Sequence, residues 1–331
     1  MTAMNSVSGW LLDRVVQIDV SAPGLAGAMF RCSTERRQVV ASYLSLEQPH
    51  QKFESEAALG SFLVEARHGE ILRAAFGSVP EGMRGALRRA GSRAHPRRFY
   101  GYLHEILASE SRAAIRALIP YLACVNPSIL QRSRALPSDL LSPTLVSALK
   151  NSVTAREVSR LVDLLEGAGV DRAAMCRVLS SAKKMDEVIA FASTWSFRAE
   201  LPAHPVPKTD FYDPIEHASD LKCIASKYRN CMRSMLANVL DGRSAFALIR
   251  IDEAEAVAHL VNHQGSWQLL EVCGPNNKPP TAALLAQATN YLKGHGIERR
   301  HRFRSDASKW QPLRRLVGHE SIQMEMDEVL L

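Results

Sequence analysis

Cys231 is the side chain of this sequence best suited to nucleophilic chemistry. Arg229 and Arg233 flank it, and cationic neighbours lower the pKa of a thiol, which increases the fraction of reactive thiolate. His259 falls on a predicted strand and could accept the thiol proton, and His263 is a second candidate base. The alternative is an inert thiol, because most free cysteines on amphipathic helices are buried. The sequence therefore offers a catalytic pair of Cys231 and His259 as one hypothesis and a buried thiol as the other.

The segment CGPNNKPP, residues 273–280, joins a predicted strand to a predicted helix and is a candidate binding loop. Glycine and asparagine suit the backbone of a tight turn, and a proline fits the first turn of a helix. A helix N-terminus attracts anions, and a neighbouring lysine would strengthen that attraction. The alternative is a structural turn whose amide side chains bond their own backbone. The candidate anion-binding residues are Asn230, Gly274, Asn276, Asn277 and Lys278.

Two arginine-rich segments stand out in a chain whose formal net charge is +7. Residues 82–99 contain no acidic residue, and residues 296–316 place Phe303 and Trp310 among the arginines. Basic side chains spaced by aromatic rings can bind phosphates and stack on bases. The alternative is that the arginines cover helix surfaces and pair with acids. The candidate nucleic-acid-binding residues are Arg88, Arg89, Arg93, Arg97, Arg98, Arg299, Arg300, Arg302 and Arg304.

Several other kinds of chemistry are not indicated. The six cysteines are scattered and no CxxC motif occurs, which favours reduced thiols in a cytoplasmic protein over disulfides or a zinc site. No apolar run approaches about 18 residues and no signal peptide is visible, so we expect no membrane segment. The absence of GxGxxG, GxxxxGKS, HExxH and GxSxG argues against a nucleotide-driven motor, a zinc protease and an α/β-hydrolase. We expect no metal and no cofactor.

The secondary structure predicted for the first part of the chain is helical. From residue 33 to about residue 197 the apolar spacing is helical, with Ser or Thr as a predicted N-cap at the start. No fixed repeat period occurs, so a named helical repeat is not indicated. We predict a helical domain over residues 1–200, with a sub-boundary near residue 95, that acts as a scaffold or binds a protein partner. The Pro-rich segment 199–214 cannot continue a helix and is predicted to be a linker.

Beyond the linker, residues 215–331 are predicted to form a small α+β domain with a basic C-terminal tail. Helical spacing over residues 215–240 gives way to three strands and then to another helix. The predicted strands and the helix that follows them are 244–251, 256–263, 266–273 and 281–294. Strands joined by turns this short pair antiparallel. The predicted fold class is therefore α+β, with a mostly helical N-terminal two thirds and a three-stranded antiparallel meander flanked by helices.

The predicted α+β domain carries a set of short motifs in a fixed order. An Asn-Cys pair on a helix, a helix end with Val and Gly, and a Gly-x-Asn-x-x-Pro loop after the third strand all lie within residues 221–292. The residues of these motifs are Asn230, Cys231, Val239, Gly242, Gly274, Asn276, Asn277, Lys278, Pro279 and Pro280. In this combination the segment resembles the core of the PcfJ-like family of conjugative plasmids, phages and other mobile elements. The sequence departs from that family at Met235, where tyrosine is common, and at His259, where threonine is common.

Three hypotheses about function follow. The resemblance implies an association with mobile-element transfer and no defined biochemical activity. Combined with the basic segments, it favours a non-enzymatic accessory protein that binds nucleic acid, with an anion-binding loop at the strand–helix junction. The alternatives are a cysteine-dependent enzyme that uses Cys231 with His259, and a protein–protein adaptor whose basic segments meet acidic partners.

Overall fold

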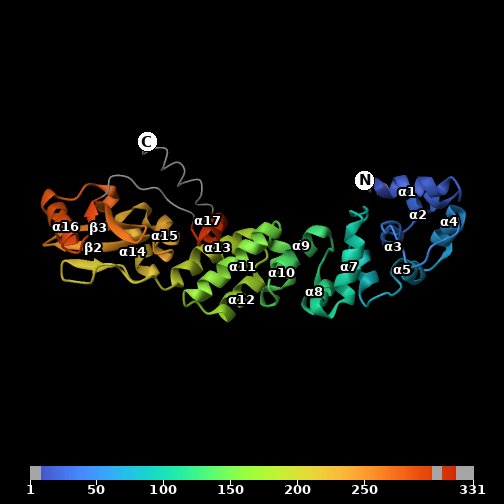
Figure 1. Cartoon of the computed structure of the whole chain (residues 1–331), viewed down its shortest axis with the longest axis horizontal. Coiled ribbons are helices and arrows are strands. Elements are labelled where there is room, and N and C mark those ends of the chain that lie inside the picture. Colours follow the sequence, from blue (N-terminus) through green and yellow to red (C-terminus); the bar gives the residue numbers. More distant parts are fainter. Residues whose placement is uncertain (1–8, 300–307, 318–331) are drawn as a thin grey trace. The chain divides into compact units, whose positions relative to one another are not determined.

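The chain folds into two compact units, Met1–Ala155 and Arg156–Leu331 (Figure 1). The structure is a computed structural model that describes residues 9–299 and 308–317. Helices make up the first unit and also precede, flank and follow the sheet of the second unit. The predicted α+β class, with a mostly helical N-terminal part, is confirmed.

The first unit consists of short helices with polar caps. Ser33 is an N-cap, as predicted, and its hydroxyl accepts a hydrogen bond from the backbone N–H of Arg36 at 3.1 Å. Proline stands at the first position of two helices, where no backbone donor is lost. The helices are α1 Trp10–Asp19, α2 Leu25–Arg31, α3 Thr34–Leu44, α4 Glu56–Glu65, α5 His68–Phe76, α6 Met83–Arg88, α7 Arg98–Ala108, α8 Ala113–Leu118, α9 Pro127–Ala135 and α10 Pro143–Ala148. Helix α11, Ser152–Gly167, continues into the second unit.

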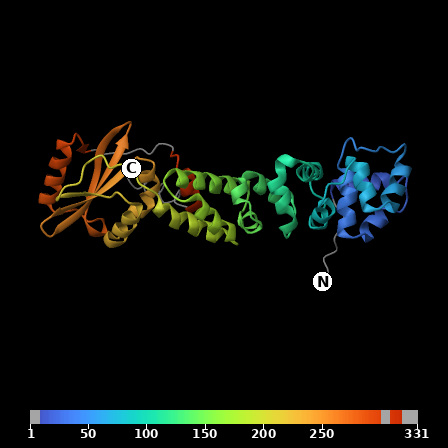
Figure 2. The same ribbon diagram turned by 90° about the horizontal axis from the view of Figure 1, so that it is seen from below.

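Helix α3 is buried among other helices of the first unit. It packs against α1, α5 and α6, and Figure 2 shows this group of helices in blue. All eight residues from Arg37 to Leu44 are buried, including the polar Arg37, Gln38 and Ser42. A helix that is covered on every side has no polar stripe, which is why its sequence lacks an amphipathic pattern. Its buried polar side chains must therefore find partners inside the fold.

The second unit places helices before, around and after a sheet. Helix α11 ends in a glycine-rich segment, where Gly169 has the left-handed φ of +84°. The helical stretch expected over residues 215–240 is interrupted at Arg229, which has φ +48° and ends a helix. The further elements are α12 Arg172–Ser181, α13 Met185–Trp195, the 3-10 turn η4 Ser196–Arg198, α14 Ala218–Tyr228, the 3-10 turn η5 Cys231–Met235, α15 Leu236–Leu240, the 3-10 turn η6 Pro275–Asn277, α16 Ala282–Gly294 and α17 Gln311–Val317.

The sheet has five strands in the order β1-β2-β3-β4-β5. The central three strands form the predicted antiparallel meander, while β5 pairs parallel to β4 and makes the sheet mixed. The prediction of three strands alone was incomplete, because both edge strands are very short. The strands are β1 Tyr212–Pro214, β2 Ser244–Ile251, β3 Ala254–His263, β4 Ser266–Cys273 and β5 Glu298–Arg299. Strand β1 lies in the Pro-rich segment and ends at a proline, which a sheet tolerates at its edge.

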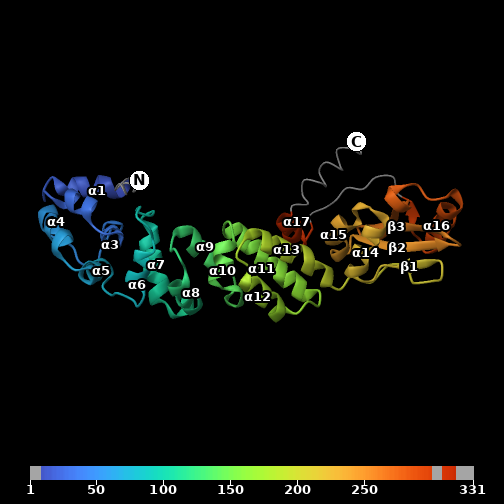
Figure 3. The same cartoon turned by 180° about the vertical axis from the view of Figure 1, so that it is seen from behind.

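Helices cover both faces of this sheet. On one face, alternate residues such as Ala247, Ala258 and Leu269 form a core with Leu284 and Ala288 of α16. The views in Figures 1 and 3 place α16 on one side of β2 and β3 and place α14 and α15 on the other side. The residues between the alternate core positions therefore face α14 and α15. This second face carries the candidate His259.

The Pro-rich segment 199–214 belongs to the second unit. Val206 and Tyr212 are buried in the core of the sheet domain, and the ring of His204 bonds to the backbone of Val206. The segment is extended, as its prolines require, but it packs against the sheet instead of spanning a gap. The compact units divide between Ala155 and Arg156, ahead of the boundary expected at residues 199–214.

Within residues 9–299 and 308–317, no helix is both long and apolar enough to span a membrane. The same described residues contain no group of three or more His, Cys, Asp or Glu side chains that could hold a metal ion.

Candidate functional site

The first arginine-rich segment forms a surface loop, which we define as the arginine loop, residues 88–98. It runs from the last residue of α6 to the first residue of α7. Four of its five arginines are exposed and one, Arg89, is half-buried. The exposed arginines are Arg88, Arg93, Arg97 and Arg98.

Two fully buried polar side chains hold the backbone of the arginine loop. The amide of Gln38, from α3, donates hydrogen bonds to the carbonyls of Gly91 and Arg93, both at 2.7 Å. The hydroxyl of Tyr100, from α7, donates to Gln38 Oε1 at 2.7 Å and accepts from the backbone N–H of His95 at 3.1 Å. Neither Gln38 nor Tyr100 is exposed to solvent. The loop backbone is therefore fixed from inside the fold, and its arginines project from a set position.

A third anchor is Trp10 of α1. Its indole N–H donates to the carbonyl of His95 at 2.9 Å, and the guanidinium of Arg97 lies 5.1 Å from the centre of its ring. The ring of His95 lies 2.7 Å from the carbonyl of Ala90 through Nε2, and burial lowers the pKa of His95. His95 is therefore neutral at neutral pH, and the positive charge of the loop comes from its arginines alone.

The charge on the arginine loop is largely uncompensated. Just before the loop, Arg84 pairs with Glu35 at 2.8 Å, and within the loop Arg89 donates to the carbonyl of Ile119 at 3.0 Å. Arg88, Arg93 and Arg98 have no ion pair with any residue that the structure describes. The arrangement can bind phosphate groups, because free exposed guanidinium groups on a fixed backbone can donate paired hydrogen bonds to them.

The second arginine-rich segment lies only in part within the described residues. Arg299 is exposed on β5, whereas Arg300, Arg302, Arg304 and Phe303 lie outside the described ranges. Trp310 is 2% exposed and packs in the interior, so the expectation that it could stack on bases is corrected. In α17, Arg315 pairs with Glu157 at 2.7 Å. This segment gives less support to a nucleic-acid site than the arginine loop does.

The junction loop has a left-handed backbone at both of its asparagines. Asn276 and Asn277 have φ values of +56° and +55°, and the loop closes with a bond from Gly274 N–H to the carbonyl of Lys278 at 2.8 Å. Gly274 itself has a negative φ, and a Cβ there would lie 3.3 Å from that carbonyl oxygen. The glycine is therefore needed for close backbone approach and not for a left-handed turn.

The expectation for the prolines of this loop is corrected by the position of the helix cap. Helix α16 begins at Ala282, and Thr281 is its N-cap, with Oγ1 accepting from Leu284 N–H at 3.3 Å. Pro279 and Pro280 thus precede the cap instead of filling the first turn. The side chains of Asn276, Asn277 and Lys278 are exposed and make no hydrogen bond with the described residues. A self-bonded turn is therefore not observed among the described residues, and the anion-binding role of these side chains stays a prediction.

Asn230 acts as a local cap. Its side-chain oxygen accepts a hydrogen bond from the backbone N–H of Met232 at 3.2 Å, and its amide nitrogen lies 3.2 Å from the sulfur of the same methionine. These bonds stabilise the start of η5. They account for an asparagine at this position without a ligand.

His259 is buried, and its ring nitrogens are directed at residues other than Cys231. Nε2 lies 3.1 Å from the hydroxyl of Ser244, and Nδ1 lies 3.7 Å from a carboxylate oxygen of Glu271. The ring stacks on Phe246, with the two ring centres 4.3 Å apart. His259 is 3% exposed. Both ring nitrogens thus have neighbours other than Cys231, and no hydrogen bond joins His259 to Cys231 among the described residues.

The thiol of Cys231 also lacks the expected activation. Its side chain is exposed, yet partial burial and then the negative charge of Glu271 raise its pKa. Flanking arginines were expected to lower that pKa, but the guanidinium of Arg233 lies over Phe197, 5.7 Å from the ring centre. The same carboxylate contacts Cys273 at 3.4 Å, and burial is the first cause that raises the pKa of Cys273 to about 12. The proposed pair of Cys231 and His259 is not formed in this structure.

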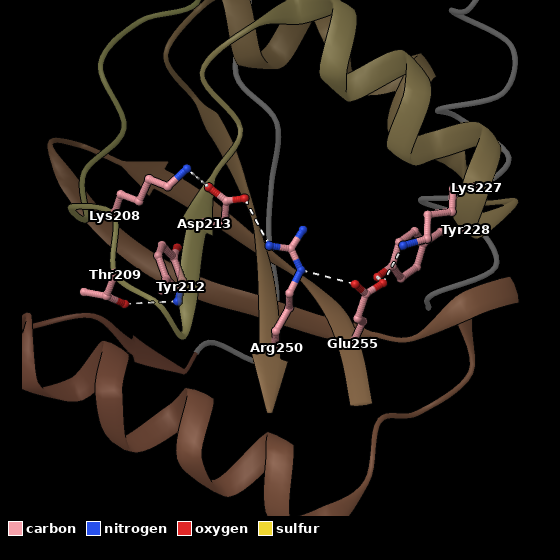
Figure 4. A network of polar contacts seen from close by, with 8 residues as sticks. All are labelled: Lys208, Thr209, Tyr212, Asp213, Lys227, Tyr228, Arg250 and Glu255. Carbon is pink, nitrogen blue, oxygen red and sulfur yellow. Dashed lines mark hydrogen bonds and ion pairs between the residues drawn. The ribbon is translucent and has the colours of Figure 1, made fainter. Parts of the chain in front are cut away.

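A network of ion pairs on the second unit was not predicted from the sequence (Figure 4). Arg250 of β2 lies between Asp213 of β1, at 3.3 Å, and Glu255 of β3, at 3.2 Å. Lys208 and Lys227 contact the outer sides of these two carboxylates, and each contact is the first cause that lowers the pKa of the acid. The network joins the edge strand and α14 to the sheet, so its role is structural.

Comparison of the chain with family models, with curated proteins and with solved structures finds no match. The resemblance to the PcfJ-like family therefore remains a prediction from the motifs within residues 221–292.

Proposed function

We propose that this protein binds nucleic acid through the arginine loop and serves as a non-enzymatic accessory protein of a mobile genetic element. The observation that carries the proposal is the set of three exposed arginines, Arg88, Arg93 and Arg98, that lack acidic partners among the described residues. Uncompensated arginines attract phosphates, and binding gains free energy from the counterions that the phosphates release.

The anchoring of the loop supports the same proposal. A flexible basic segment loses conformational entropy when it binds, whereas a loop already fixed by Gln38, Tyr100 and Trp10 loses less. Trp310, the aromatic ring expected to stack on bases, is buried, and the loop offers mainly guanidinium groups. We therefore expect binding that depends on charge and backbone, with little sequence preference.

The association with a mobile element comes from the motifs of the second unit and their likeness to PcfJ-like proteins. The two alternatives receive less support. A cysteine-dependent enzyme would need a base that accepts the Cys231 proton, whereas His259 contacts Ser244 and Glu271. An adaptor that binds acidic proteins would use the same free arginines and differs from the leading proposal only in the partner.

The proposal is tested by measuring the affinity for labelled DNA and RNA oligonucleotides over a range of salt concentrations. The variant Arg88→Gln, Arg93→Gln, Arg98→Gln should bind more weakly, and the slope of log affinity against log salt should fall by up to about 3. A control variant, Arg112→Gln, Arg116→Gln, Arg172→Gln, loses the same three charges, but each of these arginines pairs with an acid in the structure. The control should change the slope much less.

Two results would contradict the proposal. One is the absence of binding to any nucleic acid at low salt, and the other is an equal effect of the two triple variants. Recovery of partners from cell lysate with and without nuclease distinguishes the adaptor hypothesis from binding of nucleic acid. Nuclease-resistant recovery of a single acidic protein would favour an adaptor.

A further inference from the structure

A cavity of about 450 Å³ lies in the second unit, apart from the arginine loop. Three elements enclose it: the end of α13 with η4, the η5–α15 segment, and α17. Its walls are mainly apolar and include Phe197, Leu236, Ala237 and Leu313. A cavity of this size is within the range that holds small-molecule ligands. The proposed binding of nucleic acid by the arginine loop does not involve the residues of this cavity.

The charged side chains that line this cavity are positive. Arg233 and Arg314 line it, and no acidic side chain of the described residues does so. The guanidinium of Arg314 is directed by a hydrogen bond to the side-chain oxygen of Asn238, which is 1% exposed. Arg233 is exposed and has no ion pair with the described residues; its guanidinium lies over the ring of Phe197. The charged group and the apolar wall are therefore adjacent.

We infer that this cavity binds an amphiphilic carboxylate, a small molecule with an apolar body and one anionic head group. The apolar walls exclude water from the body of such a ligand. The fork of the Arg233 guanidinium matches the two oxygens of a carboxylate. A purely apolar ligand would leave Arg233 without an anionic partner, and a cationic ligand would be repelled. The inference goes beyond the proposed binding of nucleic acid and does not depend on it.

Cys231 provides a direct readout of the cavity, because it lines the rim and is exposed. Cys223 and Cys124 are also exposed but do not line the cavity, so they serve as internal controls in the same sample. Decanoate, a ten-carbon carboxylate, should slow the alkylation of Cys231 in the full chain at mildly alkaline pH and leave both controls unchanged. Mass spectrometry of the labelled peptides measures all three rates together.

Titration calorimetry with decanoate then tests the role of Arg233. Loss of a charge-assisted hydrogen bond should weaken binding by about tenfold or more in the variant Arg233→Gln. Arg229→Gln is the matched control, because Arg229 is exposed on the same segment and does not line the cavity. Decanol, which has the same body and no charge, should bind less tightly than decanoate.

Three outcomes would overturn the inference: decanoate fails to slow the alkylation of Cys231, it slows all three cysteines equally, or Arg233→Gln binds as the parent does. Protection of Cys231 by an acidic amphipathic peptide but not by decanoate would also overturn it, because the cavity would then be a peptide groove. The alkylation experiment uses the parent protein and needs no variant. Arg233 is exposed, so we expect the variant Arg233→Gln to fold as the parent does.

Discussion

The substitution Gln38→Leu tests whether the buried amide fixes the arginine loop. Leucine has a similar size but removes three hydrogen bonds, two to the carbonyls of Gly91 and Arg93 and one from the hydroxyl of Tyr100. Each bond contributes about 0.5 to 1.5 kcal/mol net, so local stability should fall by about 2 to 4 kcal/mol. Affinity for nucleic acid should fall as well, although no charge changes, because a loosened loop loses more entropy on binding.

Hydrogen exchange measured by mass spectrometry on peptides from residues 88–100 reports the free energy of local opening. Tyr100→Phe should cost less than Gln38→Leu, because it removes only the two bonds of the hydroxyl. The double variant should lose less than the sum of the single losses, since Gln38 and Tyr100 share a bond. A change in opening free energy below about 0.5 kcal/mol for Gln38→Leu, with unchanged affinity, would refute the idea that the loop is held from inside.

Three further predictions concern other sites. Burial lowers the pKa of His95 below its ordinary 6.5, so the unfolded chain gains this proton first as pH falls. The free energy of unfolding should therefore decrease as pH drops from above 6.5 towards the lowered pKa. Melting curves of parent and His95→Gln should show a weaker dependence in the variant, and equal dependence would contradict the assignment. Cys231, whose pKa is raised, should react with iodoacetamide slowly at neutral pH and faster as pH rises; rapid labelling at neutral pH would revive the nucleophile hypothesis. Asn276→Val should lower stability by roughly 1 to 2 kcal/mol because Asn276 has φ +56°, whereas Asn276→Gly should not; equal melting temperatures would count against this account.

The central strands of the second unit could be predicted because their sequence carries the pattern directly. Short apolar runs rich in strand-forming residues, separated by turn residues near Asp252 and Gln264, placed β2, β3 and β4 almost at their observed bounds. The edge strands could not be predicted in this way. Strand β1 is three residues long and ends at a proline, and the two-residue β5 exists only through its pairing with β4. Such strands are set by their neighbours and not by their own sequence.

The features of the candidate sites also differ in whether the local sequence or the tertiary fold determines them. The tight turn at Asn276 and Asn277 follows from local turn chemistry, and the sequence was sufficient to predict a turn there. The anchoring of the arginine loop by Gln38 depends on contacts 53 and 55 residues apart, and nothing in the local sequence indicates it. Similarly, the raised pKa of Cys231 comes mainly from burial in the tertiary fold and not from the arginines beside it in the chain.

The complete burial of α3 also affects how this protein can change during evolution. A surface helix drifts readily in sequence because half of its positions face water, whereas Arg37 to Leu44 offer no such position. The arginines of the loop can be exchanged for lysines or shifted by a residue and still attract phosphate. Distant relatives of this chain should therefore share the RQVVASYL segment more closely than the arginines themselves, and a search built on α3 should find them first.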